Sequence, residues 1–196
     1  MRLIRGQALR GADVVGFLVI GDGSMDERIL KALLRKFNDE KIVLMPQARP
    51  ALGLDGSLDQ AAYLIGRFGM DVLIVIDKEH FDDERFERLL GERFSEREEK
   101  ERAGSLRHLW VRRGQRSASL FVAVMGHERR IEENLAILIR ELLGEEIEGT
   151  KGAVWGFLKR LGLHVSELVR RASEEQLKVA FSTAFIEFLK RWSRKP

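Results

Sequence analysis

Three short apolar runs separated by amphipathic segments constrain the fold of this chain more than any other feature. Their sequences are VVGFLVI at Val14–Ile20, KIVLM at Lys41–Met45 and DVLIVI at Asp71–Ile76. Runs that are apolar without alternation are typical of strands buried on both faces of a sheet. The intervening segments 26–37 and 57–68 repeat apolar residues at helical spacing. Because strands joined by single helices form right-handed βαβ units, we predict an α/β fold with an open, mostly parallel sheet flanked by helices.

The pattern changes after the third strand. The helix that follows it leads into the charge-rich stretch 91–103, to which we assign no strand. The next two apolar runs, Leu106–Val111 and Ser119–Met125, flank a glycine and predict a β-hairpin with its turn near 113–117. The hairpin is expected to extend the parallel sheet.

A glycine-bearing segment, Gly144–Gly152, is the candidate linker of the chain. Two helical segments are expected beyond it, at about 153–171 and 174–193. We therefore predict an α/β domain at residues 1–148 and a helical C-terminal extension at residues 149–196.

The composition limits the class of protein. Hydrophobic residues make up 44% of the 196 residues, which is enough for a folded core. Cysteine is absent, so disulfides and thiolate metal sites are excluded. Only two Asn residues occur beside abundant Glu, Arg and Lys, which favours a heat-adapted protein. The run Val14–Ile20 is far too short to span a membrane and no cleavage pattern follows it, so we expect a cytoplasmic protein without a membrane partner.

Positive charge is concentrated at the C-terminal end of the chain. Residues 151–196 carry ten Lys or Arg against four Glu, whereas residues 1–150 carry 24 against 27 acids. This distribution favours an anionic partner, and nucleic acid is the one we predict. Of the candidate contacts with nucleic acid, Arg170 and Arg171 lie in this segment, whereas Arg112, Arg113 and Arg116 form a separate basic point at the tip of the predicted hairpin.

The same C-terminal segments permit a different interpretation. Trp155, Phe181, Phe185 and Phe188 recur at helical spacing, which is typical of core packing or of a helix-mediated homodimer. In that case the basic side chains form only a solvated rim.

Acidic side chains follow two of the predicted strands at the point where each strand ends. Asp22 follows the first strand, and Asp77 and Glu79 follow the third. If the first strand lies between the other two, these ends border the crevice where ligands gather in open parallel sheets. Residues two apart at a strand end point the same way, and three converging carboxylates repel one another unless a cation lies among them. Oxygen ligands suit Mg²⁺ or Mn²⁺. The alternative is that each acid caps a helix or lies in solvent.

Two nucleotide-binding motifs are excluded. Gly21 and Gly23 match only part of G-x-G-x-x-G, because the third glycine position is Asp26. No G-x-x-x-x-G-K-[ST] sequence is present. A flavodoxin-like domain that binds a nucleotide or another small ligand without metal stays open as a weaker alternative.

At these same acids the sequence resembles a known family. Asp22-Gly23-Ser24-Met25-Asp26-Glu27 resembles the E-G-x-x-D-E opening of Toprim domains, with Asp in the place of the usual Glu. Ile74-Val75-Ile76-Asp77-Lys78-Glu79 is similar to the strand-borne D-x-D of that family, with Glu in the second place. The resemblance covers about residues 13–90. Ile131-Glu132-Glu133-Asn134 is also similar to the I-E-[ND] helix start of Toprim proteins of the overcoming-lysogenisation-defect and small archaeal types.

The resemblance implies a Toprim-like sheet and phosphodiester chemistry on nucleic acid, as in topoisomerases, primases and nucleases. Asp22 would be the general acid/base or a metal ligand, and Asp77 and Glu79 would hold Mg²⁺ or Mn²⁺. Topoisomerase activity is excluded because the only tyrosine, Tyr63, lies in the second helix of the sheet domain. We therefore expect a metal-dependent nuclease. The alternative is a non-catalytic Toprim-fold interaction module that dimerises through its C-terminal helices.

A helix expected over about 128–143 begins beside further candidate ligands. Glu132, Glu133 and His127 could supplement the acidic centre as ligands or as a base, and His80 could contact a phosphate. The alternative is that the acids occupy a first helical turn for its dipole alone.

Overall fold

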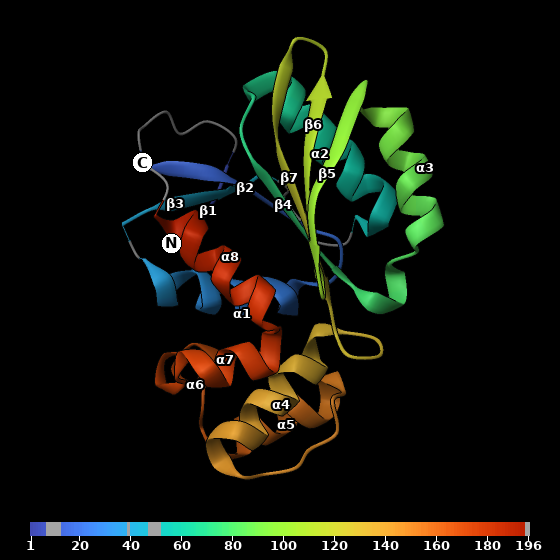
Figure 1. Cartoon of the computed structure of the whole chain (residues 1–196). Helices are drawn as coiled ribbons and strands as arrows, with labels where there is room; N and C mark the ends of the chain where they lie inside the picture. Colours follow the sequence, from blue (N-terminus) through green and yellow to red (C-terminus); the bar gives the residue numbers. More distant parts are fainter. Residues whose placement is uncertain (7–12, 39, 47–51, 195–196) are drawn as a thin grey trace.

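The computed structural model describes residues 1–6, 13–38, 40–46 and 52–194 (Figure 1). Its centre is a seven-stranded sheet in the order β1-β3-β2-β4-β7-β6-β5. All pairs from β1 to β7 in that order are parallel, and β6 and β5 continue the sheet antiparallel. The α/β class, the mostly parallel open sheet and the hairpin extension predicted above are therefore confirmed. The strands are β1 (Arg2–Arg5), β2 (Val14–Ile20), β3 (Ile42–Met45), β4 (Val72–Asp77), β5 (Glu96–Ala103), β6 (Leu106–Arg113) and β7 (Arg116–Met125).

Helices cover both faces of the sheet. Helices α2 and α3 pack on one face and α1 and α8 on the other, while α4 to α7 gather beyond the sheet, in the lower part of Figure 1. Among the described helices, none combines the length and the apolar character that crossing a membrane requires. The helices are α1 (Ser24–Phe37), α2 (Gly53–Phe68), α3 (Asp83–Arg93), α4 (Ile131–Leu143), α5 (Lys151–Arg160), α6 (Val165–Arg171), α7 (Glu174–Phe181) and α8 (Thr183–Ser193), with a single 3₁₀ turn, η1 (Lys78–His80).

The central strand β2 explains why its sequence is apolar without alternation. Leu18 and Ile20 belong to the hydrophobic cluster on the α1 and α8 face, whereas Phe17 and Val19 belong to the cluster on the α2 and α3 face. Both sets are buried. Strand β2 lies between β3 and β4, and its last residue, Ile20, pairs with Val75. The carboxyl ends of β2 and β4 are therefore neighbours, as the site prediction requires.

Strands β1 and β5 were not predicted, and both lie at the edges of the sheet. Seven of the eight residues of β5 are exposed, so this strand needs no apolar alternation. A charged edge strand also discourages pairing with a second sheet. The sequence of 91–103 is therefore typical of a solvated segment, although its part Glu96–Ala103 forms β5 and pairs with β6.

The two C-terminal segments each form two helices rather than one. The segment 153–171 divides between α5 and α6, where Gly162 takes a left-handed backbone conformation with φ +64°. The segment 174–193 divides at Ser182, whose φ of 70° is unusual for a residue other than glycine. The Ser182 hydroxyl accepts from the Phe185 N–H and so caps α8.

The C-terminal helices share a core with the sheet. Phe188 of α8 lies against Phe121 of β7, with ring centroids 4.4 Å apart. Phe185 and Trp192 are buried in the same cluster as Leu18 of β2. Residues on both sides of position 148 thus contribute to one hydrophobic cluster.

Gly16 of β2 is where this packing is closest. A Cβ atom there would lie 2.6 Å from the Asp71 carbonyl oxygen and 2.7 Å from the Trp192 ring. We expect Gly16→Ala to lower the free energy of unfolding by about 1–3 kcal/mol, because the extra carbon must displace backbone or the α8 side chain. Urea denaturation measures this. Gly156→Ala is the control, since its Cβ meets nothing within 4 Å in α5, and it should be neutral or slightly stabilising. Equal midpoints for the two variants would contradict the packing.

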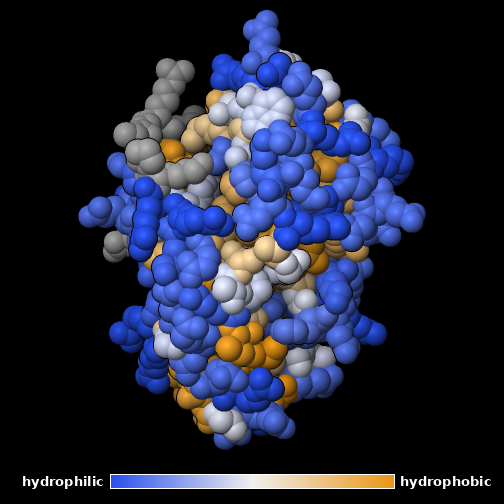
Figure 2. Space-filling view, in the orientation of Figure 1, coloured by the Kyte–Doolittle hydropathy of each residue, from blue (hydrophilic) through white to orange (hydrophobic). Residues whose placement is uncertain are grey.

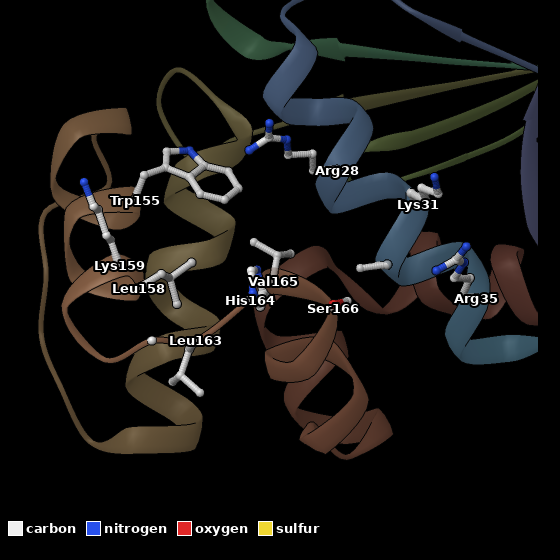
Figure 3. A pocket seen from close by; sticks show the side chains of 12 residues that line it. Arg28, Lys31, Arg35, Trp155, Leu158, Lys159, Leu163, His164, Val165 and Ser166 are labelled. Carbon is white, nitrogen blue, oxygen red and sulfur yellow. The ribbon is translucent and has the colours of Figure 1, made fainter.

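The surface is uneven in polarity. Figure 2 shows hydrophilic side chains over most of one face and a hydrophobic patch in its lower, helical part. A pocket of about 500 Å³ lies between α1 and the α5–α6 segment (Figure 3).

Candidate metal centre

Three aspartates meet where β2 and β4 end. Asp22 follows β2, Asp77 is the last residue of β4, and Asp26 lies in the first turn of α1. Each offers a carboxylate oxygen, and the three oxygens lie within 4.8 Å of one another. The three side chains belong to residues that are 9%, 7% and 5% exposed, for Asp22, Asp77 and Asp26 respectively. Negative charge is therefore concentrated in a largely buried space.

The Asp22 carboxylate is fixed on two sides. One oxygen accepts the backbone N–H of Asp77 at 2.6 Å, and the other lies 2.5 Å from Nδ1 of His80. Neither contact is with the N-terminus of α1, so Asp22 is not acting as the cap of that helix. The contacts instead connect the end of β2 to the end of β4 and to η1.

The Asp77 carboxylate connects the sheet to α4. It accepts the backbone N–H of Ile131, the first residue of α4, at 2.8 Å. The next residue, Glu132, is only 4% exposed and is close enough for its charge to act on Asp77 and Asp26. Asn134, one turn into α4, accepts the Gly126 N–H and donates to the Ala180 carbonyl oxygen of α7. The start of α4 is thus hydrogen-bonded both to Asp77 of the sheet and to Ala180 of α7.

Burial and mutual repulsion disfavour the charged forms of these acids. Burial, strengthened by the charges of the neighbouring carboxylates, raises the pKa of Asp26 from 3.8 to about 8. Burial likewise raises the pKa of Asp77 to about 7, although the Ile131 N–H acts in the opposite direction. Among the described residues, no Lys or Arg forms an ion pair with Asp22, Asp26 or Asp77, and Asp22 instead contacts the imidazole of His80. A divalent cation held by all three would relieve both effects.

Glu79 lies outside this group of carboxylates, contrary to the expectation that it points the same way as Asp77. Its carboxylate pairs with Arg130 at 3.0 Å. The reason is local: β4 ends at Asp77 and the 3₁₀ turn η1 begins at Lys78. The two-residue alternation of a strand therefore no longer applies at Glu79.

The supplementary candidates have separate places. Glu133 accepts the backbone N–H groups of Glu128 and Arg129, at 2.7 and 3.1 Å, and so orders the loop before α4. Although burial raises the pKa of Glu133, these donors outweigh it and hold that pKa below its ordinary value. The His127 side chain is exposed, and its carbonyl oxygen accepts from Lys78. Of the three candidates, only Glu132 acts on the aspartates by its charge.

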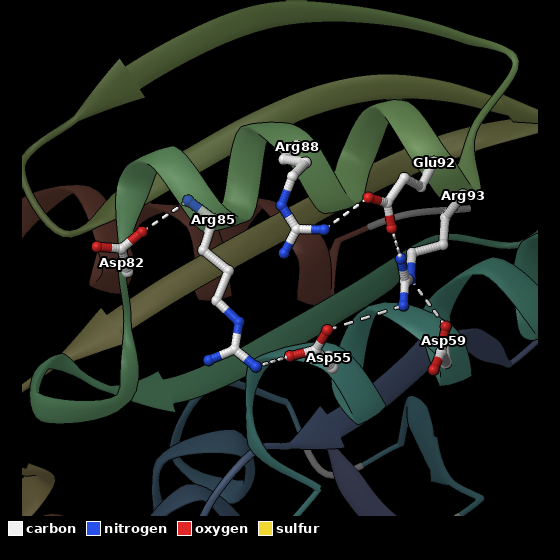
Figure 4. Close-up of polar contacts among 7 residues, drawn as sticks. All are labelled: Asp55, Asp59, Asp82, Arg85, Arg88, Glu92 and Arg93. Atoms are coloured by element: carbon white, nitrogen blue, oxygen red, sulfur yellow. Dashed lines mark hydrogen bonds and ion pairs between the residues drawn. The ribbon is translucent and has the colours of Figure 1, made fainter.

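A cavity of about 660 Å³ opens at Asp22, the one of the three aspartates that lines it, and its wall also includes Glu79, His80 and Arg85. Figure 4 shows how its outer wall is fixed. Asp82 caps α3 by accepting the Arg85 N–H, and the Arg85 guanidinium pairs with Asp55 of α2. A substrate group entering this cavity would approach Asp22 between one imidazole and one guanidinium.

The predicted basic residues lie elsewhere. Arg112, Arg113 and Arg116 surround the β6–β7 turn, at the opposite end of β7 from its pair with Asp77. Arg116 lies nine positions before Met125 along β7, so the turn lies about 30 Å from the three aspartates. Arg112 pairs with Glu96 at 3.1 Å, and Arg113 donates to the Arg93 carbonyl oxygen. The remaining two, on α6, are Arg170, which lines a pocket against α1, and Arg171, which pairs with Glu167.

Comparisons of the chain with protein-family models, with curated proteins and with solved structures give no significant match. The function is therefore argued from the geometry of the site and from its local sequence.

Asp26 is the residue of the centre that the sequence analysis did not assign. It lies in the first turn of α1, and its carboxylate oxygen lies within 4.8 Å of those of Asp22 and Asp77. We expect Asp26→Asn to weaken Mn²⁺ binding at least about tenfold, because it removes a buried ligand. Glu79→Gln removes the same charge from an exposed ion pair and should change the affinity less than about threefold. Calorimetric titration of both variants with Mn²⁺ measures the difference. A larger loss in Glu79→Gln would restore the ligand set predicted from the sequence.

Proposed function

We propose that this protein is a metal-dependent nuclease that hydrolyses nucleic-acid phosphodiesters with Mg²⁺ or Mn²⁺. The observation that carries the proposal is the group of three buried aspartates whose oxygens lie within 4.8 Å of one another without a Lys or Arg partner among the described residues. All-oxygen ligands of this kind suit Mg²⁺ and Mn²⁺. The local resemblance of residues 22–27 and 74–79 to Toprim motifs supports the choice of a phosphodiester substrate.

Asp22, Asp26 and Asp77 would hold the cation, and Glu132 would add negative charge behind it. A bound divalent cation supplies charge neutralisation for the scissile phosphate and lowers the pKa of a coordinated water. The chain's own side chains have distinct tasks. The Asp77 N–H and His80 fix the Asp22 carboxylate, and the adjoining cavity is lined by Arg85, which is paired with Asp55, and by further carboxylates whose charge a bound cation would offset for an entering phosphate.

The proposal places the enzyme in the cytoplasm with nucleic acid as its partner. The alternative, a non-catalytic module that dimerises through its C-terminal helices, has less support. Phe185, Phe188 and Trp192 are at most 2% exposed and pack against the sheet of their own chain. A homodimer through the C-terminal helices would therefore use other side chains, such as Leu161 and Val179, which are 52% and 53% exposed.

Cleavage of end-labelled substrates tests the proposal. Single- and double-stranded DNA and RNA are incubated with the full chain in Mg²⁺, in Mn²⁺ and in EDTA, and the products are separated by size. Cleavage that requires the cation and is lost in Asp22→Asn is the expected result. Intact substrates of all four kinds after long incubation with Mn²⁺, or cleavage that continues in EDTA, would refute it.

A further inference from the structure

A basic groove runs along α1 on the side where α5 and α6 pack. We use this name for the 500 Å³ pocket together with a second pocket of about 800 Å³ that shares Ala32, Arg35, His164 and Ser166 with it. Figure 3 shows Arg28 of α1 reaching across the first pocket toward the ring of Trp155. The cationic side chains that line the first pocket are Arg28, Lys31, Arg35 and Lys159.

The three α1 cations form one stripe. Arg28, Lys31 and Arg35 are exposed and stand at positions i, i+3 and i+7, which share one face of a helix. At 1.5 Å per residue the stripe is about 10 Å long. Behind the stripe the pocket has an apolar floor that includes Trp155, Leu158 and Leu163.

In the part of the chain that the structure describes, the stripe and Lys159 have no counter-charges. Among the described residues, none of Arg28, Lys31, Arg35 and Lys159 forms an ion pair, and no carboxylate lines the first pocket. Other cations of this chain are well paired: Arg107 contacts Asp83, Glu87 and Glu99. In the second pocket the one acid is Glu167, which is held by Arg171.

This arrangement is unfavourable for the helix alone. Like charges three and four residues apart repel one another, as Arg28 and Lys31 do, and so do Lys31 and Arg35. The helix dipole compensates Arg35 in the last turn but opposes Arg28, which lies near the N-terminus. A bound anion along the stripe would remove the repulsion.

We propose that the basic groove binds the phosphate backbone of a single nucleic-acid strand. The choice of nucleic acid rests on the proposed function, whereas the anionic character of the ligand rests on the groove itself. A pocket of this size accommodates one strand and is too small for a duplex. The cations would neutralise successive phosphates while Trp155 and its apolar neighbours contact sugar or base. The strand would lie along the same helix whose first turn carries Asp26, and so would be guided toward the metal centre.

Binding is tested in EDTA, so that cleavage plays no part. The anisotropy of a fluorescein-labelled 12-nucleotide single strand is followed against the full chain, and against the triple variant Arg28→Glu, Lys31→Glu, Arg35→Glu. We expect the triple variant to bind at least about tenfold more weakly, and the salt dependence of log K to become less steep by about 2, for three lost phosphate contacts. The control triple variant Arg2→Glu, Lys100→Glu, Arg140→Glu changes the net charge equally at exposed positions outside the groove, and it should bind within about twofold of the parent.

Further measurements separate this inference from the nuclease proposal. Asp77→Asn should bind the strand in EDTA as tightly as the parent, so loss of cleavage and loss of binding are distinguishable. Trp155→Phe should remove the change in tryptophan fluorescence that binding produces in the parent. If the triple variant does not fold, Lys31→Gln with Arg35→Gln replaces it, with a smaller loss expected. Equal affinity of the groove variants and the parent would overturn the inference, and so would binding of tripolyphosphate without binding of the strand.

Discussion

Asp77→Asn is expected to lower metal-dependent cleavage by at least about 1000-fold while leaving the metal-free protein at least as stable as the parent. Under the proposed function the variant would remove a cation ligand, and charge stabilisation by such a cation supplies several kcal/mol, where each tenfold in rate corresponds to about 1.4 kcal/mol. The metal-free stability follows from the contacts of Asp77. An asparagine oxygen still accepts the Ile131 N–H, and its amide donates toward Asp22 or Asp26.

The two effects have opposite signs, and this makes the experiment informative. If Asp77 were only a structural cap for α4, Asn would serve nearly as well, and both cleavage and stability would be retained. If it is a ligand, the thermal midpoint rises or stays constant in EDTA, and the increase that Mg²⁺ gives the parent disappears. Cleavage assays and thermal melts with and without Mg²⁺ measure both quantities on the same samples. A variant that is destabilised in EDTA yet still cleaves would contradict the assignment.

The metal-free protein is expected to lose stability as the pH rises from about 4 to about 8. Asp77 and Asp26 have folded-state pKa values of about 7 and about 8, above the ordinary 3.8. In this window the folded state binds more protons than the unfolded state, so raising the pH favours unfolding. Each group contributes at most about 1.4 kcal/mol per pH unit, until the pH passes its folded-state pKa.

Mg²⁺ should abolish this decline, because the cation takes the place of the protons. The stabilisation that Mg²⁺ gives should therefore grow with pH up to about 8. Glu133 acts in the opposite sense: its pKa lies below the ordinary 4.5, so its contribution is present above that pH and is lost as the pH falls. Urea denaturation at several pH values, with EDTA or Mg²⁺, measures the slopes. Asp26→Asn should flatten the metal-free slope and Asp13→Asn, at an exposed position, should not. A metal-free stability that rises between pH 5 and 8 would contradict the electrostatics of the centre.

The parts of the fold that could be predicted are those where burial determines the residue type. Strands β2 and β4 are buried on both faces and therefore show continuous apolar runs. Their parallel direction and their adjacency in the sheet bring Asp22 and Asp77 together; the direction followed from the sequence, whereas the adjacency was an assumption that the structure confirms. Strand β5 has no such requirement, since an edge strand is stabilised by its backbone hydrogen bonds to β6 with its side chains in water.

Which acids belong to the acidic centre depends on tertiary placement, which the spacing of residues in the sequence does not determine. Glu79 turns away because the chain enters a 3₁₀ turn one residue after Asp77, and Arg130, 51 residues later, is placed to receive it. Asp26 joins because α1 begins close enough to β4 for its first turn to face Asp77. Both are consequences of tertiary placement. Asp26 is part of the local motif at residues 22–27, but its spacing from Asp22 did not distinguish a member of the acidic centre from an acid that only favours the start of a helix.

The hydrogen bond from the Ile131 N–H to the Asp77 carboxylate couples the position of the first turn of α4 to the acidic centre. Neutralising the Asp77 carboxylate weakens its hydrogen bond to the start of α4. In the same helix, Asn134 accepts the Gly126 N–H and donates to the Ala180 carbonyl oxygen near the end of α7. Binding or loss of a cation at the three aspartates should therefore change the rate of amide hydrogen exchange at Ile131 and Gly126. Helix α7, which contributes no side chain to the three aspartates, would then change its amide hydrogen exchange when a cation binds there.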